Sequence, residues 1–377
     1  MAGEASGDGH GAGLMREARA IDPAISFVGI GGREMRAAGL ESIHDAESIA
    51  VVGFLEVVRH LPVLRRAYAA CIEELNKGVD GVVLVDYPGF NLKLAGECRR
   101  RGRPVLYFIC PQVWAWKPGR IDRIARSVDR MLVVFPFEVD LFRGKGMEVE
   151  YVGHPLVDAT RSPAARETIA ARAGLDLSRP VLGLLPGSRT SEIRRNLPPA
   201  LGAARLLKRF FRGLQVLFPV ASTLSLREIE AAIAPYSDLE IRLRQEPLKE
   251  LMPACTAAIV SSGTATLETA LLEVPMVVIY RLNPFTAALA RRLAVTGTFG
   301  LVNIVAGRLI MPECIQENCT PEKIAKAVER HLADPAAREA AVASLTEVRA
   351  KLGEGGAYER AGRSLVDFLA KRTGAPH

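Results

Sequence analysis

The sequence predicts an α/β protein made of two doubly wound parallel-sheet domains of the Rossmann type. Strand-like apolar runs alternate with helical patterns from one end of the chain to the other. These runs are continuous in Val, Leu and Ile, which is typical of strands buried on both faces of a parallel sheet. The length of 377 residues suggests two domains of ordinary size rather than one.

Five strands are predicted in the first half of the chain. In order they are SFVGIGG (26–32), GVVLVDYPG (81–89), PVLYFIC (104–110), RMLVVFPF (130–137) and VEYVGHP (149–155). We assign them to an N-terminal domain of residues 1–160. The polar stretch at 161–180 predicts a single helix that links this domain to the next.

Five further strands are predicted after the linking helix. They are PVLGLLPG (180–187), LQVLFPV (214–220), LEIRL (239–243), AAIVSSG (257–263) and PMVVIYR (275–281). They form a predicted C-terminal domain of residues 161–354. The last helical pattern, at about 355–377, is expected to pack back on the first domain. Ligands of two such domains are expected at the carboxyl ends of the strands, in a cleft that both domains face.

Two glycine-rich turns in the second half predict a binding site for a nucleotide diphosphate. They are GLLPGSRTSE (183–192) and VSSGTATLE (260–268), and each joins an apolar strand to a helix. Backbone N–H groups at such helix starts suit a phosphate. Arg189 can fork onto phosphate oxygens, and Glu268 can accept from ribose hydroxyls. Either turn alone is equally compatible with an ordinary strand-to-helix connection.

Asp86 is the candidate chemical residue of the first half. It follows five residues of a predicted strand, GVVLV, and therefore lies at the carboxyl edge of the sheet. Partial desolvation there could raise its pKa toward that of a useful base. The alternative is that Asp86 caps the next helix.

Composition narrows the class of protein. No apolar stretch approaches the roughly 20 residues that span a bilayer, and the start lacks a signal-peptide pattern, so we expect a cytoplasmic chain. The six cysteines and six histidines show no metal-ligand spacing, so neither a metal nor a cofactor is predicted. The net charge of +7 favours anionic partners, but no nucleic-acid-binding signature accompanies it, and no nucleic acid is predicted.

The segment Ile49–Arg66 combines an apolar run with cations, IAVVGFLEVV followed by RHLPVLRR. This combination is typical of a surface that enters an anionic lipid interface. A buried helix with a solvated basic end is the alternative.

Many ordered motifs show that the chain resembles the lipid-A-disaccharide synthases over essentially its whole length. They are AGEASGD (2–8), DYPGFN (86–91), CPQVWAWKPGRI (110–121), FPFE (135–138), VGHPL (152–156), LPGSR (185–189), SGTATLE (262–268), PMVVIYRLNPFT (275–286), LVNIVAGR (301–308) and PECIQENCTP (312–321). The SGT-x-x-LE string also occurs in MurG-type transferases and UDP-N-acetylglucosamine epimerases, whereas VWAW and GEASGD are unusual.

The resemblance implies an inverting glycosyltransferase with the two-domain GT-B fold. Its substrates would be UDP-2,3-diacylglucosamine and 2,3-diacylglucosamine 1-phosphate, and its products a β-1,6-linked disaccharide 1-phosphate and UDP. Asp86 is the implied base, with Glu4 and Asp8 as other carboxylates near the cleft. Arg189 would stabilise the charge that develops on the departing diphosphate.

The resemblance also implies two sets of binding residues. The acceptor side would use Gly3, Glu4, Ser6, Asp8, Asn91, Gln112 and Trp114. The nucleotide side would use Gly187, Ser188, Arg189, Ser262, Gly263, Thr264, Thr266, Glu268, Asn303 and Gln316. Ordinary loop hydrogen bonding is the alternative for Asn303 and Gln316, and core packing is the alternative for Trp114.

Because both substrates carry two acyl chains, we expect peripheral association with the anionic cytoplasmic face of the inner membrane. The docking residues would be Val52, Phe54, Leu55, Val58, Arg59, Arg65 and Arg66. The oligomeric state is left open by the sequence. Other UDP-sugar enzymes of this fold, or a non-catalytic lipid- or nucleotide-binding protein, are the competing interpretations.

One departure from the family concerns the N-terminus. Members normally carry a short apolar strand before GEASGD, whereas only Met1-Ala2 precede that motif here. We interpret the first strand of the N-terminal domain as missing, either because the start is assigned late or because the chain is truncated. Its buried side chains would contribute roughly 1.5 to 3 kcal/mol each. We therefore expect an added upstream apolar segment to raise yield and melting temperature.

Overall fold

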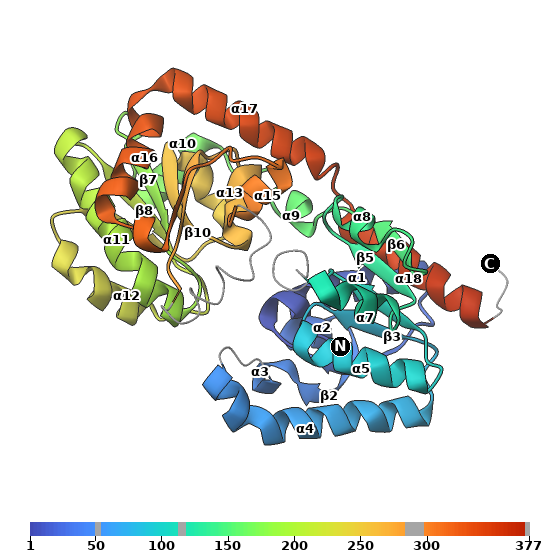
Figure 1. The fold of residues 1–377 in the computed structure, drawn as a ribbon. Coiled ribbons are helices and arrows are strands. Elements are labelled where there is room, and N and C mark those ends of the chain that lie inside the picture. The colour runs from blue at the N-terminus through green and yellow to red at the C-terminus, as the bar shows by residue number, and fades with distance from the viewer. Residues whose placement is uncertain (50–53, 112–117, 283–297, 374–377) are drawn as a thin grey trace. The chain divides into compact units, whose positions relative to one another are not determined.

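The computed structural model describes residues 1–49, 54–111, 118–282 and 298–373. The chain forms two compact units (Figure 1): Met1–Pro155 with Glu354–His377, and Leu156–Gly353. The division after Pro155 compares with the predicted division after residue 160. Both units are built from parallel sheets and helices, so the predicted α/β class is confirmed.

The first unit contains seven described segments that pair as parallel strands, six of them full strands. In chain order its elements are α1 (Ala5–Ile21), β1 (Phe27–Gly31), α2 (Arg33–Ala37), β2 (Leu40–Asp45), α3 (Ala46–Ile49), α4 (Phe54–Lys77), β3 (Val82–Val85), α5 (Pro88–Arg100), β4 (Val105–Phe108), η1 (Pro118–Arg120), α7 (Ile121–Ala125), β5 (Arg130–Val133), α8 (Glu138–Phe142), β6 (Glu148–Tyr151) and, from the C-terminus, α18 (Ala357–Thr373). All residues of β4 and β5 are buried, as expected for strands covered on both faces.

Met1 and Ala2 connect two sheets of the first unit. Strands β1 and β2 form one sheet, and β3 to β6 form the other. Ala2 donates to the carbonyl of Ile30 at 3.0 Å and pairs in parallel with Val85, whose N–H donates to Met1 at 2.9 Å. With these two residues counted as a strand, the order is that of a Rossmann sheet, and its switch point lies between Ala2 and β3.

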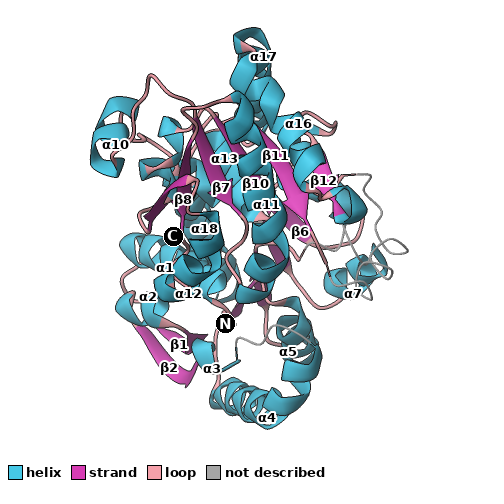
Figure 2. Ribbon diagram, turned by 90° about the vertical axis from the view of Figure 1, so that its left-hand side faces the viewer, coloured by secondary structure: helices cyan, strands magenta, loops and turns pink. Residues whose placement is uncertain are grey.

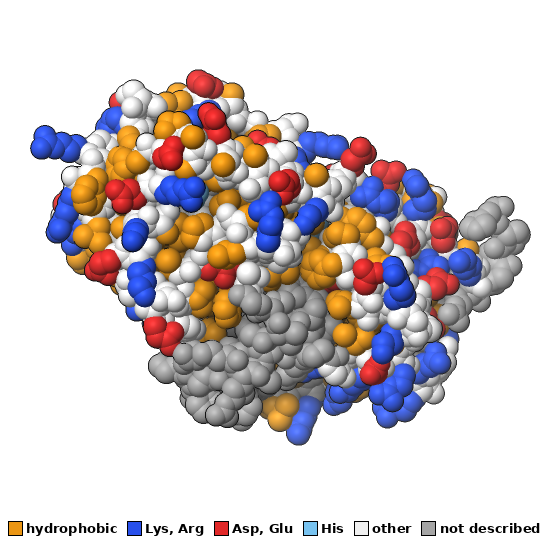
Figure 3. Space-filling model, turned by 45° about the horizontal axis from the view of Figure 1, so that its top comes forward, with side chains coloured by type: hydrophobic (Ala, Val, Ile, Leu, Met, Phe, Trp, Pro, Cys, Tyr) orange, Lys and Arg blue, Asp and Glu red, His pale blue; other side chains and the backbone are white. Residues whose placement is uncertain are grey.

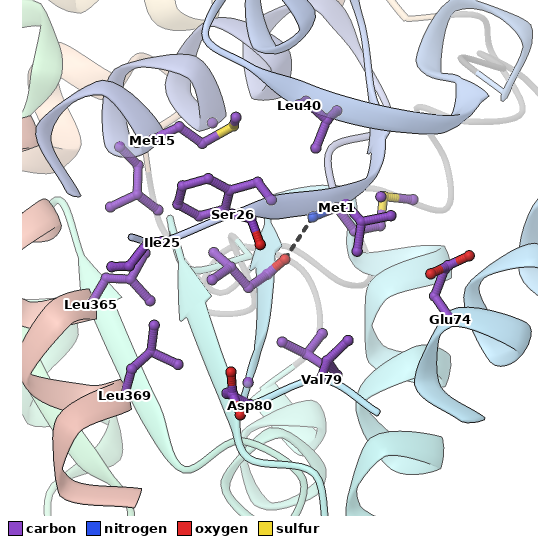
Figure 4. A pocket seen from close by; sticks show the side chains of 18 of the residues that line it. Met1, Met15, Ile25, Ser26, Leu40, Glu74, Val79, Asp80, Leu365 and Leu369 are labelled. Atoms are coloured by element: carbon purple, nitrogen blue, oxygen red, sulfur yellow. Dashed lines mark hydrogen bonds between the residues drawn. The ribbon is translucent and has the colours of Figure 1, made fainter. Parts of the chain in front are cut away.

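A cavity of about 490 Å³ lies next to Met1 in the first unit (Figure 4). It is lined by residues of β1 and β3 and by apolar side chains of α1 and α18, including Met15, Leu365 and Leu369. The amino group of Met1 donates to the carbonyl of Val83 at 2.6 Å, the bond that is dashed in Figure 4. Burial lowers the pKa of this amino group from 8.0 to about 6. Protein interiors seldom leave voids much larger than a water molecule, so this gap between two strand edges is unusual.

The second unit contains a six-stranded parallel sheet (Figure 2). Its elements are α9 (Pro155–Ala159), α10 (Arg166–Ala173), β7 (Val181–Leu185), α11 (Thr190–Phe210), β8 (Gln215–Pro219), α12 (Leu226–Ile233), η2 (Ala234–Tyr236), β9 (Glu240–Arg244), η3 (Leu248–Glu250), η4 (Met252–Ala254), β10 (Ala257–Ser261), α13 (Thr264–Leu271), β11 (Met276–Tyr280), α15 (Leu301–Ala306), β12 (Glu313–Ile315), η5 (Gln316–Asn318), α16 (Pro321–Ala333) and α17 (Pro335–Lys351). Figure 1 shows α11 and α16 on one side of the strands and α13 and α15 on the other.

The strand order in this sheet is β12-β11-β10-β7-β8-β9. The chain begins at the centre with β7, moves outward through β8 and β9, and returns to place β10 on the other side of β7. This is the Rossmann order, whose switch point lies between β7 and β10. Both strands are buried along their whole length, which agrees with their continuous apolar sequences.

Two details of the predicted secondary structure were wrong. The single linking helix expected at 161–180 is shorter, because α10 spans only Arg166–Ala173 and ends where Gly174 adopts a left-handed φ of 68°. Strands β2 and β12 were not predicted. Strand β2 has the sequence LESIHD and is largely exposed, and β12 has only three residues, so neither shows a continuous apolar run.

The C-terminal helix α18 packs against α1 in the first unit. Arg130, at the start of β5, donates from Nη1 to the carbonyl of Ser364 at 2.8 Å and also contacts Glu148 through Nη2. The hydroxyl of Ser364 donates to Glu150 at 2.5 Å. A guanidinium that is almost completely buried therefore ties the end of the chain to β5 and β6.

Candidate active site

The carboxyl edge of the sheet in the second unit brings the two glycine-rich turns together. They follow β7 and β10, which are neighbours at the switch point where such sheets bind ligands. Gly187 has a φ of 139° and Gly263 a φ of 146°, values that other residues rarely adopt. Among the described residues, a Cβ atom at Gly263 would meet nothing within 4 Å, so none of them fills the space beside this turn.

An acidic side chain occupies the first of these turns. Arg189 is the N-cap of α11, and its side chain is 53% exposed. Glu192 accepts from the backbone N–H of Ser188 at 3.0 Å, and its second oxygen lies 3.4 Å from Nη1 of Arg189. These two donors are the groups that were predicted to bind phosphate. A bound diphosphate would therefore compete with a carboxylate of the chain itself.

The second turn presents one carboxylate and one hydroxyl to a ligand. Glu268 is half-buried, its carboxylate forms no hydrogen bond with the described residues, and burial raises its pKa. Thr264 is exposed at the start of α13. Thr266 is buried and donates to the carbonyl of Gly263 at 2.8 Å, and Ser262 donates its hydroxyl to another backbone carbonyl. The last two side chains therefore shape the turn.

Asn196 of α11 links three strand ends at this edge, and the sequence did not suggest it. Its Nδ2 donates to the carbonyl of Pro186 at 3.0 Å and to the hydroxyl of Ser261 at 3.2 Å. Its Oδ1 accepts from the backbone N–H of Arg281 at 3.0 Å. The side chain is completely buried, so it holds β7, β10 and β11 in register at the two turns. An Asn on the apolar face of a predicted helix was the available signal.

The two remaining nucleotide-side candidates differ from each other. Asn303 is completely buried, and its amide donates to Met311 and Glu313 and accepts from Ile310 and Met311, all at 2.8–2.9 Å. These bonds use its whole hydrogen-bonding capacity. Gln316 instead lies at the carboxyl end of β12 in a left-handed conformation with φ 53°, and its side chain is half-buried. Gln316 is therefore the more accessible of the two.

In the first unit, two carboxyl groups meet at the switch point. Glu4 is the N-cap of α1 and follows the Met1–Ala2 segment. Asp86 follows β3, the neighbour of that segment. Burial, and then the charge and hydrogen bond of Glu4, raise the pKa of Asp86 from 3.8 to about 6. A carboxylate with such a pKa suits proton abstraction near neutral pH.

The other residues of the GEASGD motif have different positions. Gly3 is buried against the ring of Tyr87, where a Cβ atom would lie 2.3 Å from a ring carbon, so only glycine fits. Ser6 is exposed on α1. The buried carboxylate of Asp8 accepts from three backbone N–H groups at the start of α2, at 2.7–3.1 Å. Asp8 therefore caps a helix, and its oxygens are already engaged.

The backbone after β3 is left-handed at two successive residues, with φ 44° at Asp86 and 47° at Tyr87. Such a conformation costs of order 1–3 kcal/mol for each residue other than glycine. Asn91 of α5 is completely buried and donates to the carbonyls of Val85 at 3.1 Å and Asp86 at 2.8 Å. Asn91, which was predicted to contact the acceptor, instead donates hydrogen bonds within the turn at Asp86.

Some of the predicted site residues lie outside the part of the chain that the structure describes. These are Val52, Gln112 and Trp114, and the side chains of Phe54, Leu55, Val58 and Arg59 at the start of α4 are also not described. Arg65 and Arg66 are exposed on α4, and Leu61 is 41% exposed one helical turn earlier. Exposed cations therefore accompany an exposed apolar side chain on this helix.

Three features of the described residues concern the partners of the protein: the surface charge, the hydrophobicity of the helices and the grouping of metal-binding side chains. Figure 3 shows Lys and Arg side chains interspersed with Asp and Glu on the face that it draws. None of the helices, over the residues described, is long and apolar enough to cross a bilayer. Among the same residues, no group of three or more His, Cys, Asp or Glu side chains is arranged to hold a metal ion.

Comparisons with known proteins identify relatives along the whole chain. The family model described as lipid-A-disaccharide synthetase matches residues 1–363. A lipid-A-disaccharide synthase of Geobacter metallireducens is 45% identical over 376 residues, covering 99% of this chain and 97% of its own. A protein of the same name from Anaeromyxobacter dehalogenans is 42% identical over 373 residues, covering 98% and 96%.

Solved structures with low sequence identity share the fold. MnaA of S. aureus in complex with UDP has a TM-score of 0.61 at 14% identity, covering 98% of this chain and 96% of its own. MurG of Acinetobacter baumannii has a TM-score of 0.53 at 16% identity, covering 96% of each chain. These similarities concern the arrangement of the strands and helices only.

Proposed function

Because the chain belongs to the lipid-A-disaccharide synthetase family, we propose that it transfers 2,3-diacylglucosamine from UDP to 2,3-diacylglucosamine 1-phosphate. The protein is a lipid-A-disaccharide synthase, a glycosyltransferase of lipid A biosynthesis with the GT-B fold. The products are the β-1,6-linked disaccharide 1-phosphate and UDP. The paired carboxyl groups of Glu4 and Asp86 at a sheet switch point are the observation that favours this chemistry.

Asp86 acts as the general base in this proposal. The primary hydroxyl of the acceptor attacks the anomeric carbon from the face opposite UDP, its proton passes to the Asp86 carboxylate, and the bond between the anomeric carbon and the diphosphate oxygen breaks. A raised pKa brings the base closer to the pH of the reaction, which strengthens proton abstraction. Burial is the main cause of that raised pKa, and the neighbouring charge and hydrogen bond of Glu4 add to it.

The donor binds at the turns after β7 and β10. Arg189 and the backbone N–H of Ser188 donate hydrogen bonds to the diphosphate, in place of the carboxylate of Glu192. The positive charge of Arg189 and the dipole of the Ser188 amide offset the negative charge that develops on UDP as it leaves. Glu268 accepts from the ribose hydroxyls, because its carboxylate forms no hydrogen bond with the described residues.

Two substitutions test these roles. Asp86→Asn should lower kcat by roughly 100- to 10,000-fold, the usual contribution of a general base, with little change in KM. Arg189→Ala should lower kcat and also weaken UDP binding, measured by calorimetry. The control is Asp80→Asn, because Asp80 is exposed and lies before the other end of β3. This substitution should leave kcat and UDP affinity unchanged. Unimpaired turnover in Asp86→Asn would remove Asp86 as the base.

The start of α4 is the proposed membrane-docking surface. Leu61, Arg65 and Arg66 are exposed on this helix, and an apolar side chain beside two cations suits an anionic lipid interface. Leu61, Arg65 and Arg66 follow the apolar residues Val52, Phe54, Leu55 and Val58 in the sequence. The side chains of these four residues would enter the acyl region of the membrane, and Arg59 would contact the lipid phosphates. The proposed site of docking is the anionic cytoplasmic face of the inner membrane.

Flotation with phosphatidylglycerol vesicles tests the docking surface. Phe54→Glu with Leu55→Glu should abolish flotation, and Arg65→Glu with Arg66→Glu should weaken it by about 1 kcal/mol for each cation removed, or more because the charge is reversed. The control is Arg99→Glu with Arg100→Glu, which changes another exposed basic pair in the same unit. If the control loses flotation and the α4 variants do not, docking occurs elsewhere.

A further inference from the structure

The catalytic turn of the first unit adopts a conformation that its own sequence does not favour. Asp86 and Tyr87 both have positive φ values, 44° and 47°. Aspartate tolerates this region, whereas an aromatic residue adopts it rarely. Two successive residues of this kind persist only where the surrounding structure holds them. The contacts around the turn show what holds it.

Two buried donors converge on one carbonyl oxygen of this turn. The hydroxyl of Tyr107, on β4, donates to the main-chain carbonyl of Asp86. Nδ2 of Asn91, on α5, donates to the same oxygen at 2.8 Å and to the carbonyl of Val85 at 3.1 Å. The N–H of Asp86 also donates to Phe108 of β4 at 3.2 Å. The peptide groups on both sides of the Asp86 Cα atom are therefore fixed from neighbouring elements.

Neither donor is accessible to a substrate. Tyr107 and Asn91 are completely buried, so the Tyr107 hydroxyl and Nδ2 of Asn91 act on the turn, whereas Oδ1 of Asn91 has no hydrogen-bond partner among the described residues. A phenylalanine would fill nearly the same volume as Tyr107 but would lack the hydroxyl that donates to the carbonyl of Asp86. A buried hydroxyl directed at the carbonyl of the proposed base thus has a positioning task that packing alone does not require.

We propose that Tyr107 and Asn91 are positioning residues that clamp the left-handed turn at Asp86 and so hold its carboxyl group beside Glu4. This inference rests on the proposed function, in which Asp86 is the base. Tyr107 supplies the hydroxyl half of the clamp from the sheet, and Asn91 supplies the amide half from the helix that follows the turn. Loss of either half lets the backbone relax toward negative φ and moves the carboxyl group.

Loss of the clamp should change the pKa of Asp86. The titratable groups that face Asp86 are Glu4 from α1 and, from β4 and the turn after it, Tyr107 and Cys110. Burial and Glu4 raise the pKa of Asp86 to about 6. Movement of the carboxyl group away from this position exposes it to water and to less of the Glu4 charge. Its pKa then falls toward 3.8.

Tyr107→Phe tests the clamp. We expect kcat to fall roughly tenfold to a hundredfold, as for a small misplacement of a reacting group, with KM for both substrates within about twofold. The acidic limb of the kcat/KM profile should move below the wild-type position near pH 6. Carbon-13 NMR of the Asp86 carboxyl group, assigned with Asp86→Asn, should show the same fall in pKa without depending on turnover. Asn91→Leu should give the same pattern.

The control is Tyr151→Phe, which removes a hydroxyl from β6 of the same unit and should leave the kinetic constants and the Asp86 pKa unchanged. An unchanged kcat and an unchanged Asp86 pKa in Tyr107→Phe would overturn the clamp. If Asp86→Asn turns over normally, the base assignment fails instead. The two failures are distinguishable because the NMR titration reports the position of the carboxyl group even in an inactive variant.

Discussion

Replacing the proposed base should make the first unit more stable. Asp86→Asn removes a carboxyl group whose pKa is raised from 3.8 to about 6, mainly by burial and then by Glu4. At about 1.4 kcal/mol for each pH unit, the charged carboxylate costs at most about 3 kcal/mol above pH 6. Partial exposure of the side chain to water reduces this value. Asparagine tolerates a left-handed backbone, so the turn itself is retained.

The sign of the pH dependence follows from the raised pKa. The folded chain binds the Asp86 proton more tightly than the unfolded chain, so this group destabilises the fold progressively as the pH rises from about 4 to about 6. Of the total, roughly 1.4 kcal/mol develops between pH 5 and pH 8. Asp86→Asn lacks this dependence. The variant should therefore gain more over the wild type at pH 8 than at pH 5.

Thermal unfolding of both proteins at pH 5 and pH 8 measures the effect. A gain of 3 kcal/mol corresponds to a rise of roughly 6–12 °C for a unit of this size, and smaller gains scale accordingly. Asp80→Asn, which removes an exposed carboxylate, is the matched control and should show no such difference. A variant that is equally stable or less stable than the wild type at pH 8 would refute the argument from burial.

Three further predictions follow from the described contacts. Asn196→Ala removes three hydrogen bonds at the strand ends beside the two glycine-rich turns, so UDP affinity measured by calorimetry should fall by about tenfold or more. The control Asp80→Asn should keep its UDP affinity. Glu192→Gln removes the carboxylate charge beside Ser188 and Arg189, so UDP should bind more tightly and with a stronger salt dependence; weaker binding would mean that Glu192 assists the diphosphate. A segment of four apolar residues added before Met1 should enter the cavity between β1 and β3 and replace the buried amino group of Met1 by a peptide group. The added segment should therefore raise the melting temperature. Four serines added at the same place should not raise it.

The positions of most strands and of the two glycine-rich turns were accessible from the sequence, because buried parallel strands are continuous apolar runs and turns of this kind require glycine. Gly187 and Gly263 have the positive φ values that explain their presence. Strand β2 was not accessible, because LESIHD is polar and is held by pairing with β1. Its existence depends on a neighbouring strand and not on its own composition.

The contacts that shape the site depend on long-range geometry. The motifs suggested a ligand contact for Asp8, Asn91 and Asn303, yet each of these side chains forms hydrogen bonds with backbone groups of the chain, and Asn303 also donates to the side chain of Glu313. A sequence shows that a polar residue lies near a strand end but does not show which group it meets. Tyr107 and Asn196 carried no motif at all, because a buried tyrosine or asparagine within an apolar element is compatible with many roles until its partner is known.

The most direct test of the account is UDP release from UDP-2,3-diacylglucosamine in detergent micelles that contain a metal chelator, with and without 2,3-diacylglucosamine 1-phosphate. UDP release should depend on the acceptor and should yield a disaccharide in equal amount. Release without the acceptor, or conversion of the donor sugar without transfer, would identify a hydrolase or an epimerase. No release from protein that is shown to be folded and to bind UDP would contradict the transferase assignment.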